Sequence, residues 1–121
     1  MRRVQEIGTR ARSQPPPPHV VFEALTQPNR DPARQWLTLL DDEQPPVVLV
    51  AQAPSLVVWS SLWPRRPDAR VRFDVLPGGA ETSLRWTLLV DEPLPDASLT
   101  GHLRKRLNQL VNAQLRYSFG Q

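Results

Sequence analysis

The sequence predicts an α+β domain in which a curved antiparallel β-sheet is wrapped around one long C-terminal α-helix, with two short helices after the first strand. Three observations carry this prediction. From residue 47 to residue 90 the hydrophobic period is that of strands, with clean alternation after residue 69. From Leu99 to Val111 apolar residues recur every three to four positions, which is the period of a helix. Most of the 14 prolines lie between apolar segments, where they separate short elements.

Length and composition indicate a single globular domain over residues 1–121. The chain has no cysteine, which excludes disulfides, thiolate metal sites and cysteine nucleophiles. Its longest apolar run, Val47–Ala53, is too short to span a bilayer, and no signal-like apolar stretch follows Arg2 and Arg3. We therefore expect a cytoplasmic protein with no membrane contact. The net charge of +3 is small and basic residues never exceed three in a row, so we expect no nucleic-acid partner.

The N-terminal third predicts one strand and two helices. Residues 3–13 alternate weakly, with Ile7 on one face and Arg10 and Arg12 on the opposite, solvated face. The prolines at 15–18 end this strand because proline cannot donate to a ladder. They are read either as a polyproline ligand or as a rigid turn with Pro18 in the first turn of a helix that ends near Pro28.

The second helix is predicted from Ala33 to about Leu40, because Asp31 followed by Pro32 forms a good cap and first helical position. Residues 47–53 and 56–63 then form a hairpin around Pro54, and residues 69–76 and 82–90 form a second one around Gly78 and Gly79.

The C-terminal helix begins after a cap at Asp96 or Ser98 and runs for about 24 residues. Its apolar stripe is formed by Leu99, Leu103, Leu107, Leu110 and Val111 and is expected to pack on the sheet. The opposite, solvated side is expected to carry Arg104, Lys105, Arg106, Asn108 and Asn112.

This order of elements resembles the helix-grip fold of the START-like, or SRPBCC, superfamily, which includes Bet v 1-type and polyketide cyclase-like proteins. Pro17–Leu25 is similar to the superfamily's proline-led opening of the first helix, and Pro54–Trp59 to its central strand entry. Phe73–Leu84 resembles its penultimate hairpin, with one glycine fewer and an inserted acid. The Arg-rich last helix is similar to that of small bacterial members. Only Asp41–Pro46 fills the interval where typical members have an extra hairpin, which implies six or fewer strands.

The resemblance implies that a ligand would lie between the concave face of the sheet and the long helix. Strand and helix periods then predict the side chains that line such a cavity: Phe22, Trp36, Trp59, Ser61, Phe73, Trp86, Leu103, Leu107 and Leu110. The same large aromatic side chains can equally fill the space as a solid core.

The favoured function is therefore the binding of a small hydrophobic or amphipathic molecule. A second hypothesis is a non-catalytic interaction module that acts as a homodimer through an exposed apolar sheet face, formed by Val48, Val50, Val58 and Leu62. A polyketide cyclase- or dehydratase-like enzyme is implied by the resemblance alone. The sequence contains no Ser/His/Asp set, separable carboxylate pair or metal-ligand spacing, so no catalytic residue, metal or cofactor is predicted. His102, beside the apolar stripe, is read as a solvated residue.

Overall fold

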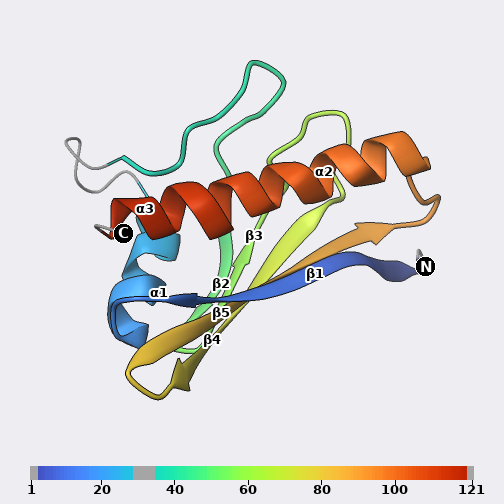
Figure 1. Cartoon of the computed structure of the whole chain (residues 1–121). Helices are drawn as coiled ribbons and strands as arrows, with labels where there is room; N and C mark the ends of the chain where they lie inside the picture. The colour runs from blue at the N-terminus through green and yellow to red at the C-terminus, as the bar shows by residue number, and fades with distance from the viewer. Residues whose placement is uncertain (1–2, 29–34, 120–121) are drawn as a thin grey trace.

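The structure is a computed structural model that describes residues 3–28 and 35–119. In this part of the chain five antiparallel strands form one sheet in the order β1-β5-β4-β3-β2. The long C-terminal helix lies along one face of the sheet, next to β1 (Figure 1). These features confirm the predicted α+β fold and its reduced number of strands. The strands are β1 (Val4–Gln14), β2 (Val48–Gln52), β3 (Leu56–Trp59), β4 (Arg70–Gly78) and β5 (Glu81–Asp91).

The centre of the sheet is the hairpin of β4 and β5, and its alternation is the one that the sequence predicts. Three apolar pairs face the helix, and each side chain is at most 2% exposed. Full burial of such a side chain stabilises the fold by about 1.5–3 kcal/mol. This face of the hairpin is therefore the floor of the core, and its pairs are Val71 with Leu88, Phe73 with Trp86, and Val75 with Leu84.

A β-bulge between Glu6 and Gly8 changes the side on which β1 presents its residues. After the bulge Arg10 pairs with Trp86 and Arg12 pairs with Leu84. Directly opposed residues of antiparallel strands lie on the same face, so both arginines lie on the helix side of the sheet. Both arginines are exposed, as predicted, but they lie on the helix side of the sheet and not on the opposite face, because one extra residue in a strand moves every later side chain to the other face.

The first predicted helix is confirmed as α1 (Pro18–Thr26), with Pro18 in its first turn. The second is not formed by residues 35–40, which have no regular secondary structure, while its predicted start at 31–34 lies outside the described residues. Backbone groups in this segment bond to side chains elsewhere: the Thr38 amide donates to Gln114 at 3.4 Å and the Leu40 amide to Glu43 at 2.9 Å. These partners replace the bonds that a helix would supply.

β3 ends at Trp59, four residues before the predicted strand end at Trp63. The Ser61 hydroxyl accepts from the Trp63 amide at 2.9 Å and donates to the Arg66 carbonyl at 2.7 Å. Such local side-chain bonds offer the backbone an alternative to a strand ladder. The turn also buries Leu62, which was predicted on an exposed sheet face.

The long helix comprises α2 (Ala97–Gln109), the π-helical turn η2 (Leu110–Leu115) and α3 (Arg116–Ser118). Asp96 caps it by accepting from the Leu99 amide at 2.8 Å, and the predicted apolar stripe is buried from Leu103 onward. Arg106 and Asn112 are each only 5% exposed, so their predicted place on the solvated side is wrong. No helix among the described residues has the length and apolar character needed to cross a membrane.

Candidate functional site

Most of the residues predicted to line a ligand cavity lie in the packed core between the sheet and the long helix. Trp59, Phe73 and Trp86 meet the helix leucines there, and all of these side chains are at most 2% exposed. Phe22 is half-buried and packs against the same core. Their role as ligand-lining residues stays a prediction. The helix leucines concerned are Leu103, Leu107 and Leu110.

Ser61 is held in the turn after β3 and is 2% exposed. Its hydroxyl is engaged by backbone groups of the same turn, as described above. The sequence pattern placed Ser61 on a strand face beside Trp59, but the turn begins before it. The Ser61 side chain therefore stabilises the turn formed by residues 60–66.

Three aromatic rings form a row that leads from the core toward the end of the long helix. The ring centroids of Phe73 and Trp59 lie 4.6 Å apart in an edge-on arrangement, and Trp59 stacks on Trp36 at 5.9 Å. The two indole groups also complete the end of α1, because Trp36 Nε1 donates to the Ala24 carbonyl at 3.0 Å and Trp59 Nε1 to the Leu25 carbonyl at 2.8 Å. Helix-end carbonyls need such external partners. Contacts between the rings and the hydrogen bonds of the two indole groups therefore hold this row in place.

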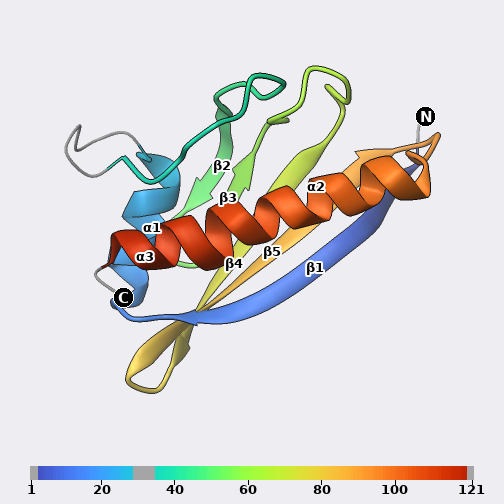
Figure 2. The ribbon, with the colours of Figure 1, turned by 45° about the horizontal axis from the view of Figure 1, so that its top comes forward.

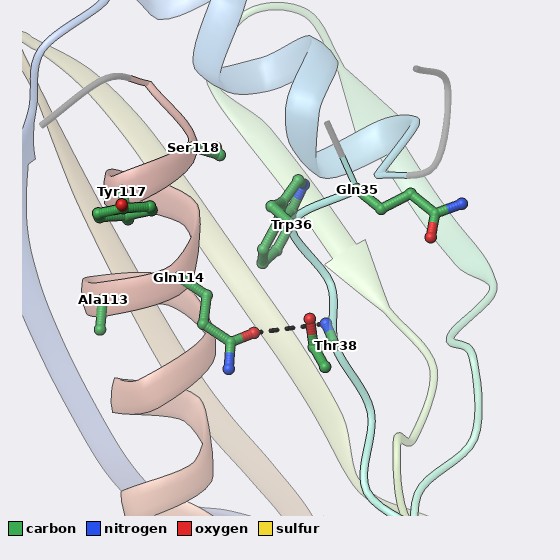
Figure 3. Close-up of a pocket in the computed structure, with 7 residues that line it drawn as sticks. All are labelled: Gln35, Trp36, Thr38, Ala113, Gln114, Tyr117 and Ser118. Atoms are coloured by element: carbon green, nitrogen blue, oxygen red, sulfur yellow. Dashed lines mark hydrogen bonds between the residues drawn. The ribbon is translucent and has the colours of Figure 1, made fainter. Parts of the chain in front are cut away.

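A cavity of about 600 Å³ lies at the outer end of this aromatic row, which we call the Trp36 cavity. Of the residues predicted to line a ligand cavity, Trp36 borders this one. Figure 3 shows its two walls: one from the chain segment before β2 and one from the last turns of the long helix. The Gln114 side chain joins the walls through its bond to the Thr38 amide. The lining residues are Gln35, Trp36, Thr38, Ala113, Gln114, Tyr117 and Ser118.

A buried ion pair attaches one of these walls to the helix. We call residues 35–46 the strap; they pass beside the helix between α1 and β2 (Figure 2). Arg106 Nε and Nη2 donate to the two carboxylate oxygens of Glu43 at 2.8 and 2.7 Å, and Nη2 also donates to the Thr38 carbonyl at 3.1 Å. The side chains of Arg106 and Glu43 are 6% and 0% exposed. The strap is therefore fixed to the helix by charge-assisted bonds.

The protonation states of this pair follow from its contacts. Burial by itself raises the pKa of Glu43, but hydrogen bonds from Arg106, the Leu40 amide and the Trp63 indole outweigh burial and hold the pKa below its ordinary value of 4.5. The bonds to Glu43 in turn raise the pKa of Arg106, against the opposing effect of burial. Both groups are therefore charged at neutral pH.

The sequence contains only half of the signal that would predict this pair. Arg106 follows Leu103 by three residues and precedes Leu110 by four, which is the spacing of the apolar stripe itself. A charged residue at such a position needs a buried partner. Nothing in the sequence indicates that the partner is Glu43, because the two residues are 63 positions apart.

The π-helical turn lies where the helix borders both the Trp36 cavity and the strand β1. Ala113 and Gln114 of this turn line the cavity, while Asn112 faces β1 and accepts a bond from Arg12 through its carbonyl. Turns of this kind inside α-helices frequently occur at functional sites.

At the other end of the helix His102 lies 3.6 Å from Asp42, and both side chains are more than 40% exposed.

Comparison with known proteins finds similarity in the fold and not in the sequence. No family model matches the sequence, and no curated protein matches it either. Among solved structures, CalU16 from Micromonospora echinospora superposes with a TM-score of 0.69 at 16% identity, over 98% of this chain and 84% of that one.

Two further structures are similar in the same way. The Aha1 dimer from Colwellia psychrerythraea has a TM-score of 0.67 at 12% identity, over 89% of this chain and 91% of that one. An AHSA1-like protein from Rhizobium etli has a TM-score of 0.62 at 19% identity, over 94% and 81%. At such identities the likeness concerns the fold, and it confirms the helix-grip architecture expected from the sequence.

Proposed function

We propose that the protein binds a small amphipathic molecule in the Trp36 cavity, between the strap and the C-terminal end of the long helix. The observation that carries the proposal is the position of this cavity at the open end of the aromatic row. Its volume of about 600 Å³ falls in the range of roughly 300–1,000 Å³ that ligand pockets occupy. The apolar part of a ligand would lie against Trp36, with Trp59 and Phe73 as a second layer behind it.

The polar groups of the lining define the rest of the ligand. Amide groups of Gln35 and Gln114 and hydroxyl groups of Thr38 and Ser118 border the cavity, and it has no charged side chain among its described lining residues. A few fixed polar groups on an otherwise apolar wall orient a ligand and set its specificity. We therefore favour an uncharged molecule with an apolar body and one or two hydroxyl or carbonyl groups.

The test is a ligand screen by melting temperature and tryptophan fluorescence, with long-chain alcohols and polycyclic aromatic alcohols as probes. A binder should change the emission of Trp36 and, at 100 times its dissociation constant, add about 2.7 kcal/mol of stability. Ser118→Phe should fill the cavity and abolish this gain. Ser98→Phe is the matched control, because it places the same ring on the exposed first turn of the same helix. A gain that survives in Ser118→Phe, or no gain with any probe, would contradict the proposal.

A homodimer is the second candidate function, and one observation favours it. β2 is an edge of the sheet, and residues 44–64, which contain it, carry no charged side chain. Val47, Leu49 and Val50 are 64%, 52% and 37% exposed on this strand and its entry. Natural proteins usually protect such an edge with charges, and an unprotected apolar edge pairs readily with another strand. Pairing of β2 with its copy would join two sheets around a twofold axis.

Analytical ultracentrifugation tests the dimer with a matched pair of variants. Leu49→Lys places a charge on the β2 edge and should yield a monomer. Leu76→Lys changes a leucine of nearly equal exposure, 54%, at the far end of β4 and should leave the dimer intact. A monomeric wild-type protein at about 100 μM would contradict the proposed dimer, since weak encounters of this kind are usually visible at such concentrations.

A further inference from the structure

The boundary between β1 and the long helix, which we call the β1–helix seam, is joined by arginines that bond to backbone carbonyls. Arg104 Nε donates to the Ile7 carbonyl at 2.6 Å, and Arg12 Nη1 donates to the Asn112 carbonyl at 2.8 Å. Arg116 donates to the carbonyl of Ser13. Strand and helix run side by side along this boundary (Figure 2). Each of these guanidinium groups satisfies a neutral acceptor and keeps its positive charge uncompensated.

The arginines of the β1–helix seam take no part in the ion pairs of the described chain. The ion pairs found among residues 3–28 and 35–119 join Arg66 to Asp68, Arg70 to Asp91, Arg72 to Asp74, His102 to Asp42 and Arg106 to Glu43. None of them includes an arginine of the β1–helix seam. Four arginines that form no ion pair within the described chain, Arg10, Arg12, Arg104 and Arg116, therefore lie along this boundary.

A groove of about 320 Å³ opens in the middle of the β1–helix seam. The bulge in β1 turns Arg10 and Arg12 to the same, helix-facing side, two residues apart. The Arg10 side chain has no hydrogen-bond partner among the described residues, and the Arg12 side chain uses one of its five donors on the Asn112 carbonyl. The groove is lined by Arg10, Ala11, Arg12, Asn108, Asn112 and Ala113.

Two asparagines complete the groove from the helix side. The Asn108 oxygen accepts from Trp86 Nε1 and from Asn112 Nδ2, both at 3.1 Å, which fixes its amide so that its own NH₂ is free of a partner in the described chain. Asn112 is 5% exposed, and its side-chain oxygen has no hydrogen-bond partner there. The groove thus offers two guanidinium groups, one amide donor and one buried acceptor.

We propose that this groove binds a phosphate monoester that carries a hydroxyl group near its phosphate. The three terminal oxygens and the charge of about −2 of a phosphate monoester match two guanidinium groups and an amide donor better than the two oxygens and single charge of a carboxylate do. The hydroxyl supplies the donor that the buried Asn112 oxygen lacks. Among the described lining residues the groove shares only Ala113 with the Trp36 cavity, so the proposal does not depend on ligand binding there.

The experiment is an NMR titration of amide shifts in the full chain with ribose 5-phosphate, inorganic phosphate and ribose. Ribose 5-phosphate should shift the amides of residues 9–13 and 108–113, inorganic phosphate should do so more weakly, and ribose should not. Arg10→Gln should weaken binding by about tenfold or more, the usual effect of losing one charge-assisted bond. Arg12→Lys, which keeps the charge but loses the planar fork, should weaken it less.

Arg85→Gln is the matched control, because Arg85 is on the neighbouring strand β5 but pairs with Ala11 on the outer face. It removes the same charge and should change affinity by less than about twofold, since exposed charges at such distances are screened by salt. Equal losses in Arg10→Gln and Arg85→Gln would overturn the proposal in favour of a diffuse charge effect. Binding to phosphatidic acid vesicles without binding to ribose 5-phosphate would overturn it in favour of a lipid surface.

A purely structural role for Arg10 would give a different experimental result. Inward-pointing charges can protect an edge strand from pairing with other chains, and β1 is an edge of the sheet. If Arg10→Gln associates in solution and keeps the phosphate affinity of the wild-type protein, edge protection is its role and the proposed site is refuted. No amide shifts with ribose 5-phosphate up to about 10 mM, the weak limit of specific recognition, would refute it as well.

Discussion

Arg106 on the long helix and Glu43 on the strap form a two-bond ion pair across 63 residues of chain, with both side chains almost fully buried. The same carboxylate accepts from the Leu40 amide at 2.9 Å and from the Trp63 indole at 3.1 Å. Glu43 thus joins the helix, the strap and the turn after β3 at one point. The strap bears one wall of the Trp36 cavity, so this pair sets the shape of the proposed binding site.

Loss of the negative charge at Glu43 should be strongly destabilising. Glu43→Gln leaves the Arg106 guanidinium buried without a counter-charge, and removal of one partner of a buried pair typically costs about 3–5 kcal/mol. Urea unfolding measures the change. Asp42→Asn is the neighbouring control: Asp42 is 45% exposed beside His102, and its substitution should cost less than about 1 kcal/mol. Equal losses in the two variants would mean that the Glu43 pair is not the attachment described here.

The coupling between the two partners can be isolated in a double-mutant cycle. Arg106→Met alone leaves the Glu43 carboxylate buried with fewer donors, whereas Arg106→Met combined with Glu43→Gln removes both charges. We expect the double variant to be more stable than the sum of the two single losses predicts, by about 0.5–3 kcal/mol. Additive losses would show that the two charges do not interact energetically.

Stability should fall in acid through this carboxyl group. The folded-state pKa of Glu43 lies below its ordinary value of 4.5, so the unfolded chain takes up the proton first as the pH falls. The stabilisation is fully present above the unfolded-state pKa and is lost as the pH falls through the folded-state pKa. The free energy of unfolding of wild type relative to Glu43→Gln should therefore be constant between about pH 7 and about pH 5.5 and decrease below about pH 4.5. A difference that grows on acidification would contradict this assignment.

Leu107 tests the packing of the long helix on the sheet. It is fully buried, and Leu107→Ala should cost about 2–5 kcal/mol, as truncation of a core leucine usually does. Lys105→Ala on the exposed side of the same helix should cost less than about 0.5 kcal/mol. Thermal unfolding of the two variants gives the comparison, and equal melting temperatures would be incompatible with a buried Leu107.

The elements that the sequence predicts well are those with a regular hydrophobic period. The strands around residues 70–78 and 81–91 and the helix from Ala97 onward each repeat their pattern over at least nine residues, so a local reading finds them. The predicted aromatic lining was harder, because the same alternation places Trp59 and Phe73 inward whether they fill the core or surround a ligand. The hydrophobic period of a strand predicts the face of the sheet on which a side chain lies. It does not predict whether other side chains or a ligand occupy the space next to that face.

The sequence by itself determined the α+β class, the succession of the strands along the chain, the proline-led start of α1 and the apolar buried faces of β4, β5 and the long helix. Tertiary structure decided the rest: the bulge that turns Arg10 toward the helix, the strap that replaces a second helix, the Ser61 turn and the burial of Arg106 on Glu43. The physical reason is that apolar burial acts through a local period, which any short window of sequence contains. The partner of a buried polar group is instead selected by the requirement that each such group be hydrogen-bonded, and that partner can lie anywhere in the chain.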